Sequence, residues 1–315
     1  MVAVGTWNLE NLYRPGGEFG PATDQAYQDK LVALASTIAE LTPDVLAVQE
    51  VGDPAALGDL VARLPDPPGW TTVLSTHPDT RGIRVGFLTR IPLSDTGEFA
   101  AFPPPLRPVQ VGDDAGDDTS AMGRGGLHLR IAVGGKDWDL VTVHLKSKLL
   151  SFPGGRFQPK DEGERARFAA YALYRRAAEA ATVRDQANTL LDGHGRERPL
   201  IVLGDLNDTQ LAATTQLLYG PPGSQYGTGG FDHPDKGDAW RLWNLAPKIP
   251  AEHRYSRIYE GQGELIDHIL ISHALLDRLV SVDVDVSGLP SIGPNPTVRR
   301  DAVGSDHAPV IARFS

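Results

Sequence analysis

The chain of 315 residues is long enough to bury a substantial core, and it contains no cysteine, which excludes disulfide-stapled folds, thiolate metal sites and cysteine nucleophiles. A hydrophobic content of 41% and a charged content of 22% are ordinary for a globular enzyme, and no apolar run reaches the ~20 residues of a membrane span. The net charge of -10 argues against a tight nucleic-acid binder, because phosphate contacts usually need a basic surface.

The charge is uneven along the chain. Residues 146–184 contain nine Lys or Arg and only four Asp or Glu. This excess predicts either a basic rim beside an acidic pocket or a salt-bridged surface helix, and the sequence leaves both open. No signal peptide precedes the first apolar run, so the simplest expectation is a cytoplasmic protein. Without tandem repeats or a low-complexity linker, we expect a single domain over residues 1–315.

The predicted elements alternate irregularly between strands and helices. Residues 24–41 predict a helix with one buried face, Asp53 is placed to cap a shorter helix, and residues 162–191 predict the longest helix. Strands are expected near residues 2–4, 44–48, 71–75, 83–89, 127–133, 138–145, 200–203, 265–271 and 309–314. Residues 99–125, rich in Pro, Gly and Asp, predict an exposed loop, whose acidic run lacks the spacing of a calcium loop. The irregular order favours two packed sheets with helices outside.

Short polar signatures begin or end several of these apolar runs. They are Trp7-Asn8-Leu9-Glu10-Asn11, Gln49-Glu50, His144-Leu145-Lys146-Ser147-Lys148, Gly204-Asp205-Leu206-Asn207-Asp208, and a closing pair, Ile266-Asp267-His268 and Ser305-Asp306-His307. Phosphodiester hydrolysis needs a hard cation, a positioned water and neutralisation of developing negative charge. Carboxylates, carboxamides and histidines at the ends of buried strands supply all three, so the pattern predicts a metal-assisted hydrolytic site.

Individual residues suggest individual roles. A buried strand-end carboxylate is costly unless it is paired or binds a cation, so Glu50 is the best single ligand candidate for Mg²⁺ or Mn²⁺. Asp205 and Asn207 are two apart and could face one side, with Asp205 deprotonating the attacking water, although such dipeptides also form ordinary turns. Asp267 is the natural partner to orient His307. His144 offers a second imidazole, whereas His268 is expected to face away.

The ordered set of signatures closely resembles the endonuclease/exonuclease/phosphatase superfamily of DNase I-like enzymes, and it extends over nearly the whole chain. The resemblance implies a four-layer α/β/β/α sandwich of two mixed β-sheets flanked by helices, with the site at one end. It also implies that Asn8, Glu50 and Asp306 surround a divalent cation, with Glu10 as a second-tier ligand. By the same resemblance, Asp205 activates water with support from Asn207. The His307–Asp267 pair would stabilise the transition state, and His144 would assist.

The sequence departs from the family pattern at one point. Many family nucleases use a Tyr or Arg after the middle strands to grip the phosphate, and none aligns here. Arg84, Lys146, Lys148 and Arg156 are candidates for this contact, or they pair with acidic residues at the rim. The His-Leu-Lys-Ser-Lys form resembles bacterial nuclease-like members rather than inositol-phosphatase or sphingomyelinase branches.

We therefore expect a divalent-metal-dependent DNA or RNA endo- or exonuclease. The first alternative is a phosphatase or phosphodiesterase on a small or lipid-linked phosphate, which the acidic composition favours. A non-catalytic binding module is the second alternative. It predicts the loss of at least one site residue, and none is lost.

Overall fold

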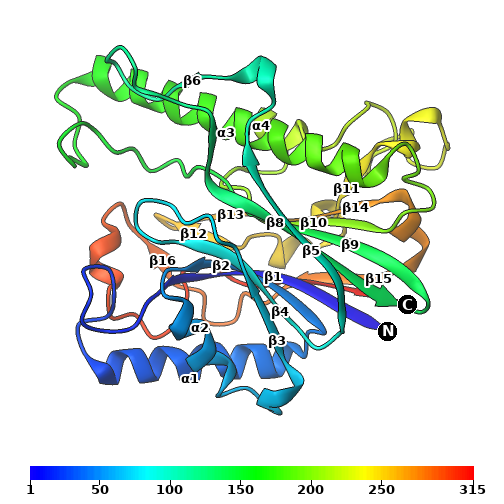
Figure 1. Ribbon diagram of the computed structural model, residues 1–315, viewed down its shortest axis with the longest axis horizontal. Coiled ribbons are helices and arrows are strands. Elements are labelled where there is room, and N and C mark those ends of the chain that lie inside the picture. The colour runs from blue at the N-terminus through cyan, green and yellow to red at the C-terminus, as the bar shows by residue number, and fades with distance from the viewer.

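The computed structural model describes the backbone of residues 1–315 and every side chain except those of residues 296 and 297. Two six-stranded mixed sheets form its centre (Figure 1). The first, in spatial order, comprises β15 (Leu279–Val284), β17 (Val310–Phe314), β1 (Val2–Leu12), β2 (Val45–Val51), β4 (Arg84–Thr89) and β3 (Thr71–Leu74). The second comprises β11 (Leu242–Asn244), β14 (Asp267–Ser272), β10 (Leu200–Asp205), β9 (Lys136–His144), β8 (Ala121–Val133) and β5 (Leu93–Ala101).

Smaller elements connect these strands. A three-stranded sheet contains β13 (Gln262–Glu264), β12 (Arg257–Tyr259) and β16 (Ser291–Ile292), and a two-stranded one contains β6 (Val109–Gln110) and β7 (Asp118–Thr119). A 3₁₀ turn, Pro296–Arg299, precedes the last polar signature.

Helices cover the outer face of each large sheet. The helices α1 (Asp24–Leu41) and α2 (Pro54–Val61) share an apolar cluster with β1 and β2, and α3 (Glu162–Leu191) shares another with β9 and β10, beside the short α4 (Ala213–Gln216). Figure 1 shows α1 below and α3 above the paired sheets. The four-layer α/β/β/α prediction is thus confirmed. Among the described residues, no helix combines the length and apolar character that crossing a membrane would require.

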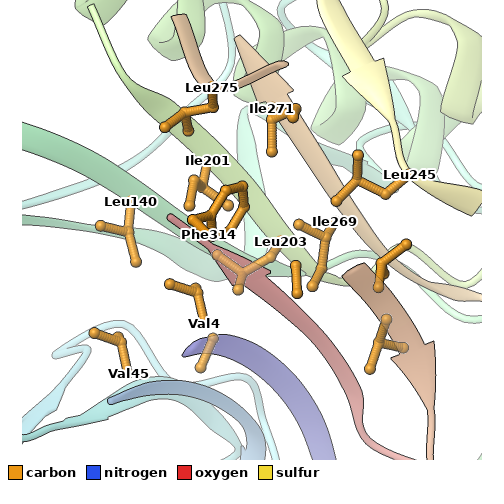
Figure 2. Packing of buried hydrophobic residues seen from close by; sticks show 14 of the residues in the cluster. Val4, Val45, Leu140, Ile201, Leu203, Leu245, Ile269, Ile271, Leu275 and Phe314 are labelled. Carbon is orange, nitrogen blue, oxygen red and sulfur yellow. The ribbon is translucent and has the colours of Figure 1, made fainter. Parts of the chain in front are cut away.

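The main core lies between the two sheets. Val4 and Val45 point from the first sheet towards Leu140, Ile201 and Leu203 of the second (Figure 2), and all five are essentially inaccessible to solvent. Side chains alternate between the faces of a strand, so residues further along β1 and β10 on this inner side also face the other sheet.

The helix predictions at 24–41 and 162–191 are confirmed, and the Asp53 side chain caps α2 by accepting the Ala55 amide at 2.9 Å. The prediction of an exposed loop over residues 99–125 is wrong at both ends. β5 extends to Ala101 and β8 begins at Ala121, because Phe102 and Met122 bury their side chains with the apolar cluster under α3.

Candidate active site

The polar signatures meet at one end of the sandwich, opposite the two termini, which lie together at the right in Figure 1. Strand register explains the convergence in the second sheet. Asp205, the last residue of β10, is paired with His144 of β9 on one side and with Asp267 of β14 on the other. In the first sheet Asn8 of β1 is paired with Gln49 of β2, directly before Glu50.

Asp205 is the centre of this site and is 1% exposed. Its Oδ2 accepts a hydrogen bond from Asn8 Nδ2 at 3.0 Å and lies 3.3 Å from His144 Nε2 and 4.0 Å from His307 Nε2. Burial, with repulsion from Asp267, raises the pKa of Asp205 to about 7. A carboxyl group with this pKa can act as a general base near neutral pH.

The two histidines beside Asp205 differ in charge. Although burial alone lowers the pKa of His307, the Asp267 carboxylate raises it to about 10, and His307 Nδ1 donates to Asp267 Oδ2 at 2.7 Å. Burial and nearby cations, including Arg124, lower the pKa of His144 well below its ordinary value. At neutral pH the site therefore contains an imidazolium at His307 and a neutral imidazole at His144.

Asp267 is itself held by Ser256, which the sequence did not indicate. Ser256 Oγ donates to Asp267 Oδ2 at 2.7 Å and accepts the backbone amides of Ile266 and Asp267. Both residues are fully buried. The arrangement fixes the carboxylate that orients His307.

Glu50 and Asp306 provide the oxygen atoms best suited to a cation. Glu50 Oε1 accepts from Asn8 Nδ2 at 3.3 Å, and Oε2 accepts from the Asn11 amide at 2.8 Å, which leaves further lone pairs on each oxygen. Within the described part of the chain, no hydrogen bond or ion pair engages the Asp306 carboxylate. Two carboxylates and the Asn8 carboxamide fit a hard divalent cation such as Mg²⁺ or Mn²⁺.

A second cluster could also attract positive charge. Asp205, Asp267 and His307 place ligand atoms within 4.8 Å of one another, and Asp267 Oδ1 is buried without a hydrogen-bond partner in the described structure. The imidazolium of His307 already offsets one of the two carboxylates. The chemistry of this cluster is therefore better suited to proton transfer than to holding a cation.

Glu10, a second-tier ligand in the resemblance, is engaged by protein partners. Both of its carboxylate oxygens bind Arg299, at 2.6 and 2.7 Å, and Oε2 also accepts the Asp306 amide at 2.9 Å. Lys30 donates to the Glu10 carbonyl from the other side. In this arrangement the Glu10 carboxylate is committed to protein partners, so its geometry favours a supporting position over that of a metal ligand.

Among the residues predicted to bind substrate, Lys148 lies near carboxylates, whereas Arg84 and Lys146 donate to backbone carbonyls. Lys148 is 46% exposed in its side chain and lies 3.3 Å from Asp208 and 3.8 Å from Glu264, and Arg84 donates to the Gly82 carbonyl at 2.7 Å. Lys146 instead donates to the carbonyls of Ser147 and Leu149.

Arg156 pairs with an acidic residue, which is the alternative to a phosphate contact that the sequence left open. Its guanidinium binds both carboxylate oxygens of Glu164, so its donors are already occupied. The surrounding basic segment is also largely neutralised, through the pairs Arg165–Glu162, Arg167–Asp113, Arg175–Glu179 and Arg176–Asp208. Residues 146–184 thus correspond more closely to the salt-bridged helix than to a basic rim.

Two cations that the sequence did not single out also act on the site. Arg81 donates to the side chain of Asn11, and the backbone amide of Asn11 donates to Glu50. Arg124 forms an ion pair with Asp79 at 2.9 Å. Both act electrostatically on His144. They come from connecting segments and a strand interior, where no short motif marks them.

Asn207 and His268 have different partners. The backbone amide of Asn207 donates to Asp205 Oδ1 at 2.8 Å, and its side-chain Nδ2 donates to the Leu145 carbonyl at 3.0 Å. His268 faces away, as predicted: its ring bonds Asn244 and the Asp208 carbonyl.

A four-layer sandwich with buried carboxylates and histidines at one end defines the DNase I-like class of proteins. The sequence model of the Endonuclease/Exonuclease/phosphatase family matches residues 5–307, and the chain belongs to this family. Its members are hydrolases that act on phosphoesters and generally use divalent metal ions.

Several solved structures share this fold. They include a mannosyl-6-phosphatase from Bacteroides thetaiotaomicron (16% identity, TM-score 0.55, all of both chains covered) and truncated TDP2 from Caenorhabditis elegans (15%, 0.57, 99% of this chain and 96% of that one). A 3'-5' exonuclease from Neisseria meningitidis is 19% identical, with a TM-score of 0.55 and full coverage of both chains. No curated protein sequence matches the chain. At these identities the likeness shows the fold alone.

Proposed function

We propose that the protein is a divalent-metal-dependent phosphodiesterase that cleaves nucleic acid, with Asp205 as the general base. The observation that carries this proposal is the position of Asp205 Oδ2. Asn8 contacts it from the first sheet, and His144 and His307 approach it at 3.3 and 4.0 Å. A buried carboxylate so surrounded is held in place to accept a proton.

In the proposed reaction, Asp205 takes a proton from water as the water oxygen bonds to phosphorus, and the bond from phosphorus to the leaving oxygen breaks on the opposite side. The imidazolium of His307, oriented by Asp267, stabilises the charge that develops on the phosphoryl oxygens. Asn207 positions the water or the phosphate, and neutral His144 supports the Asp205 carboxylate. A divalent cation held by Asn8, Glu50 and Asp306 would neutralise phosphate charge.

Nucleic acid is supported as the substrate by the cations beside the site. Arg81, Arg124 and Lys146 all act electrostatically on His144, although the whole chain has a net charge of -10. The Neisseria relative, in a second structure, is described as a 3' phosphatase bound to a product DNA hairpin. A phosphatase or phosphodiesterase acting on a small or lipid-linked phosphate is the second candidate, favoured by the acidic composition and by the ion pairs that neutralise residues 146–184.

The test compares plasmid DNA, single-stranded DNA, single-stranded RNA and p-nitrophenyl phosphate as substrates, each with Mg²⁺, Mn²⁺ or EDTA. Cleavage of a nucleic acid that requires metal and disappears in Asp205→Asn supports the proposal. His194→Ala is the matched control, because His194 is a surface histidine with a 58% exposed side chain. Hydrolysis of p-nitrophenyl phosphate with every nucleic acid intact would instead support the small-phosphate alternative.

A further inference from the structure

The segment that follows β1 carries an exposed aromatic ring beside the site. Phe19 is 37% exposed, and its ring centroid lies 5.8 Å from that of Tyr13 at an interplanar angle of 41°. The Tyr13 ring packs on Gly52, where a Cβ atom would come within 2.1 Å of it. Gly52 is two residues beyond Glu50, so this aromatic pair is anchored next to a proposed metal ligand.

Arg81 joins the aromatic pair to the site. Its guanidinium carbon lies 5.0 Å from the centroid of the Phe19 ring, and its side chain donates to Asn11 Oδ1. The Tyr13 hydroxyl in turn donates to the Arg81 carbonyl at 2.8 Å. A continuous series of contacts therefore runs from Glu50 through Asn11 and Arg81 to Phe19.

In the described part of the chain, no carboxylate lies within ion-pair distance of the Arg81 guanidinium. Among the described residues it forms no ion pair, whereas the nearby Arg14 and Arg124 pair with Asp59 and Asp79. Scattered exposed apolar residues need no explanation by themselves. An exposed ring in contact with an unpaired guanidinium, beside proposed metal ligands, has the chemistry that recognises a planar ring attached to a phosphate.

We propose that Phe19 and Arg81 form a stacking surface for a nucleobase adjacent to the scissile phosphate. This inference rests on the proposed nuclease function and narrows its substrate class. A base inside a duplex is stacked on its neighbours, so only an unpaired or terminal nucleotide can place its face on Phe19. The preferred substrate is therefore single-stranded nucleic acid or a frayed end.

The test uses two single-stranded oligonucleotides with the same phosphodiester backbone. One carries bases throughout, and the other carries abasic tetrahydrofuran residues throughout. Four proteins are compared: the wild type, Phe19→Leu, Phe19→Tyr and the control Tyr174→Leu. Tyr174 is 50% exposed, and its ring contacts Tyr171 on α3.

We expect the wild type to cleave the base-bearing strand about tenfold more efficiently, the usual effect of one base–aromatic stacking contact. Phe19→Leu should lose about that factor in kcat/KM on the base-bearing strand and nothing on the abasic strand, because stacking is absent there. Phe19→Tyr, which keeps the aromatic face, and Tyr174→Leu should match the wild type. Circular dichroism confirms that each variant is folded.

A binding measurement gives a readout independent of turnover. In the Asp205→Asn background, a strand containing 2-aminopurine should lose fluorescence when its base stacks, and this quenching should disappear with Phe19→Leu. Equal effects of Phe19→Leu on both strands, or no effect on either, would overturn the stacking inference while leaving the nuclease in place. If the wild type cleaved neither strand but hydrolysed p-nitrophenyl phosphate, the proposed function and the stacking surface would both be rejected.

Discussion

Arg299 binds both carboxylate oxygens of Glu10, with Nε 2.6 Å from Oε1 and Nη2 2.7 Å from Oε2, and so ties the segment before Asp306 to β1. Glu10 also accepts the Asp306 amide at 2.9 Å. The ion pair thus fixes the backbone of one proposed metal ligand while engaging a carboxylate that could otherwise serve as another.

Replacing Arg299 should weaken the attachment of the Asp306 segment to β1 and free the Glu10 carboxylate for a cation. In EDTA, Arg299→Met should lower the free energy of unfolding by about 3–5 kcal/mol, because it leaves the mostly buried Glu10 carboxylate without its partner. Mg²⁺ should then raise the melting temperature of Arg299→Met more than that of the wild type, since Glu10 becomes available to the cation. Thermal unfolding with and without Mg²⁺ measures both effects. The double variant Glu10→Gln/Arg299→Met is the control, and Mg²⁺ should raise its melting temperature no more than that of the wild type. Equal Mg²⁺ shifts of the melting temperature in Arg299→Met and the wild type would argue against this account.

The pairing of His307 with Asp267 predicts strongly non-additive kinetics. His307→Gln and Asp267→Asn should each lower kcat on the order of 10²–10³-fold, because each removes the oriented positive charge from the transition state. The double variant should be little worse than either single variant, since the two side chains act as one unit. Steady-state kinetics on the best substrate checks this. Multiplying losses in the double variant would mean that the two residues work independently.

Much of this site was accessible from the sequence because strands impose a simple geometry. Asp205 and His144 end the strands β10 and β9, Asp267 begins the antiparallel strand β14, and the pairing of these strands brings the three residues together. The order of the motifs along the chain is characteristic of the family. The α/β/β/α layers were predictable for the same reason: the apolar runs are separated by helices with one buried face.

The contacts that orient the site were not predictable, because they depend on loops without periodicity. Arg299 and Glu10 are 289 residues apart, and Ser256 meets Asp267 across the turn between short strands. Nothing in the sequence around Arg156 distinguishes an arginine that contacts phosphate from one already bound to Glu164. Only the fold decides which charged side chains keep free donors.

The raised pKa of Asp205 makes its ionised form a source of instability in the metal-free protein. Its folded-state pKa, about 7, lies above the ordinary value of 3.8, so the folded state binds more protons than the unfolded state between these values. The free energy of unfolding therefore falls as pH rises from about 4 to about 7, by roughly a few kcal/mol, and stays low above that range.

Asp205→Asn removes this ionisation and should raise the melting temperature in EDTA at pH 8. Its advantage over the wild type should shrink as the pH is lowered and vanish near pH 4, where Asp205 is protonated in both states. Calorimetry across this range tests the sign of the effect. Asp137→Asn, at an exposed carboxylate on β9, is the control and should show no such trend. A variant less stable than the wild type at every pH would mean that burial does not disfavour the Asp205 carboxylate.

Lys148 and Arg156 lie in the same basic segment, and their different partners predict different salt dependence. Lys148 is loosely held, 3.3 Å from Asp208 and 3.8 Å from Glu264, whereas Arg156 is bound to both oxygens of Glu164. If Lys148 contacts a backbone phosphate, Lys148→Gln should weaken nucleic-acid binding and reduce the slope of log affinity against log salt by about one.

Arg156→Gln changes the net charge by the same amount but should leave that slope unaltered, because its guanidinium is not free to reach a phosphate. Fluorescence anisotropy of a labelled strand over a salt series measures both slopes, with Asp205→Asn as the parent protein to prevent cleavage. Equal reductions in the two variants would show that the segment acts only through its overall charge. A reduction confined to Lys148→Gln would instead identify a direct phosphate contact on this side of the site.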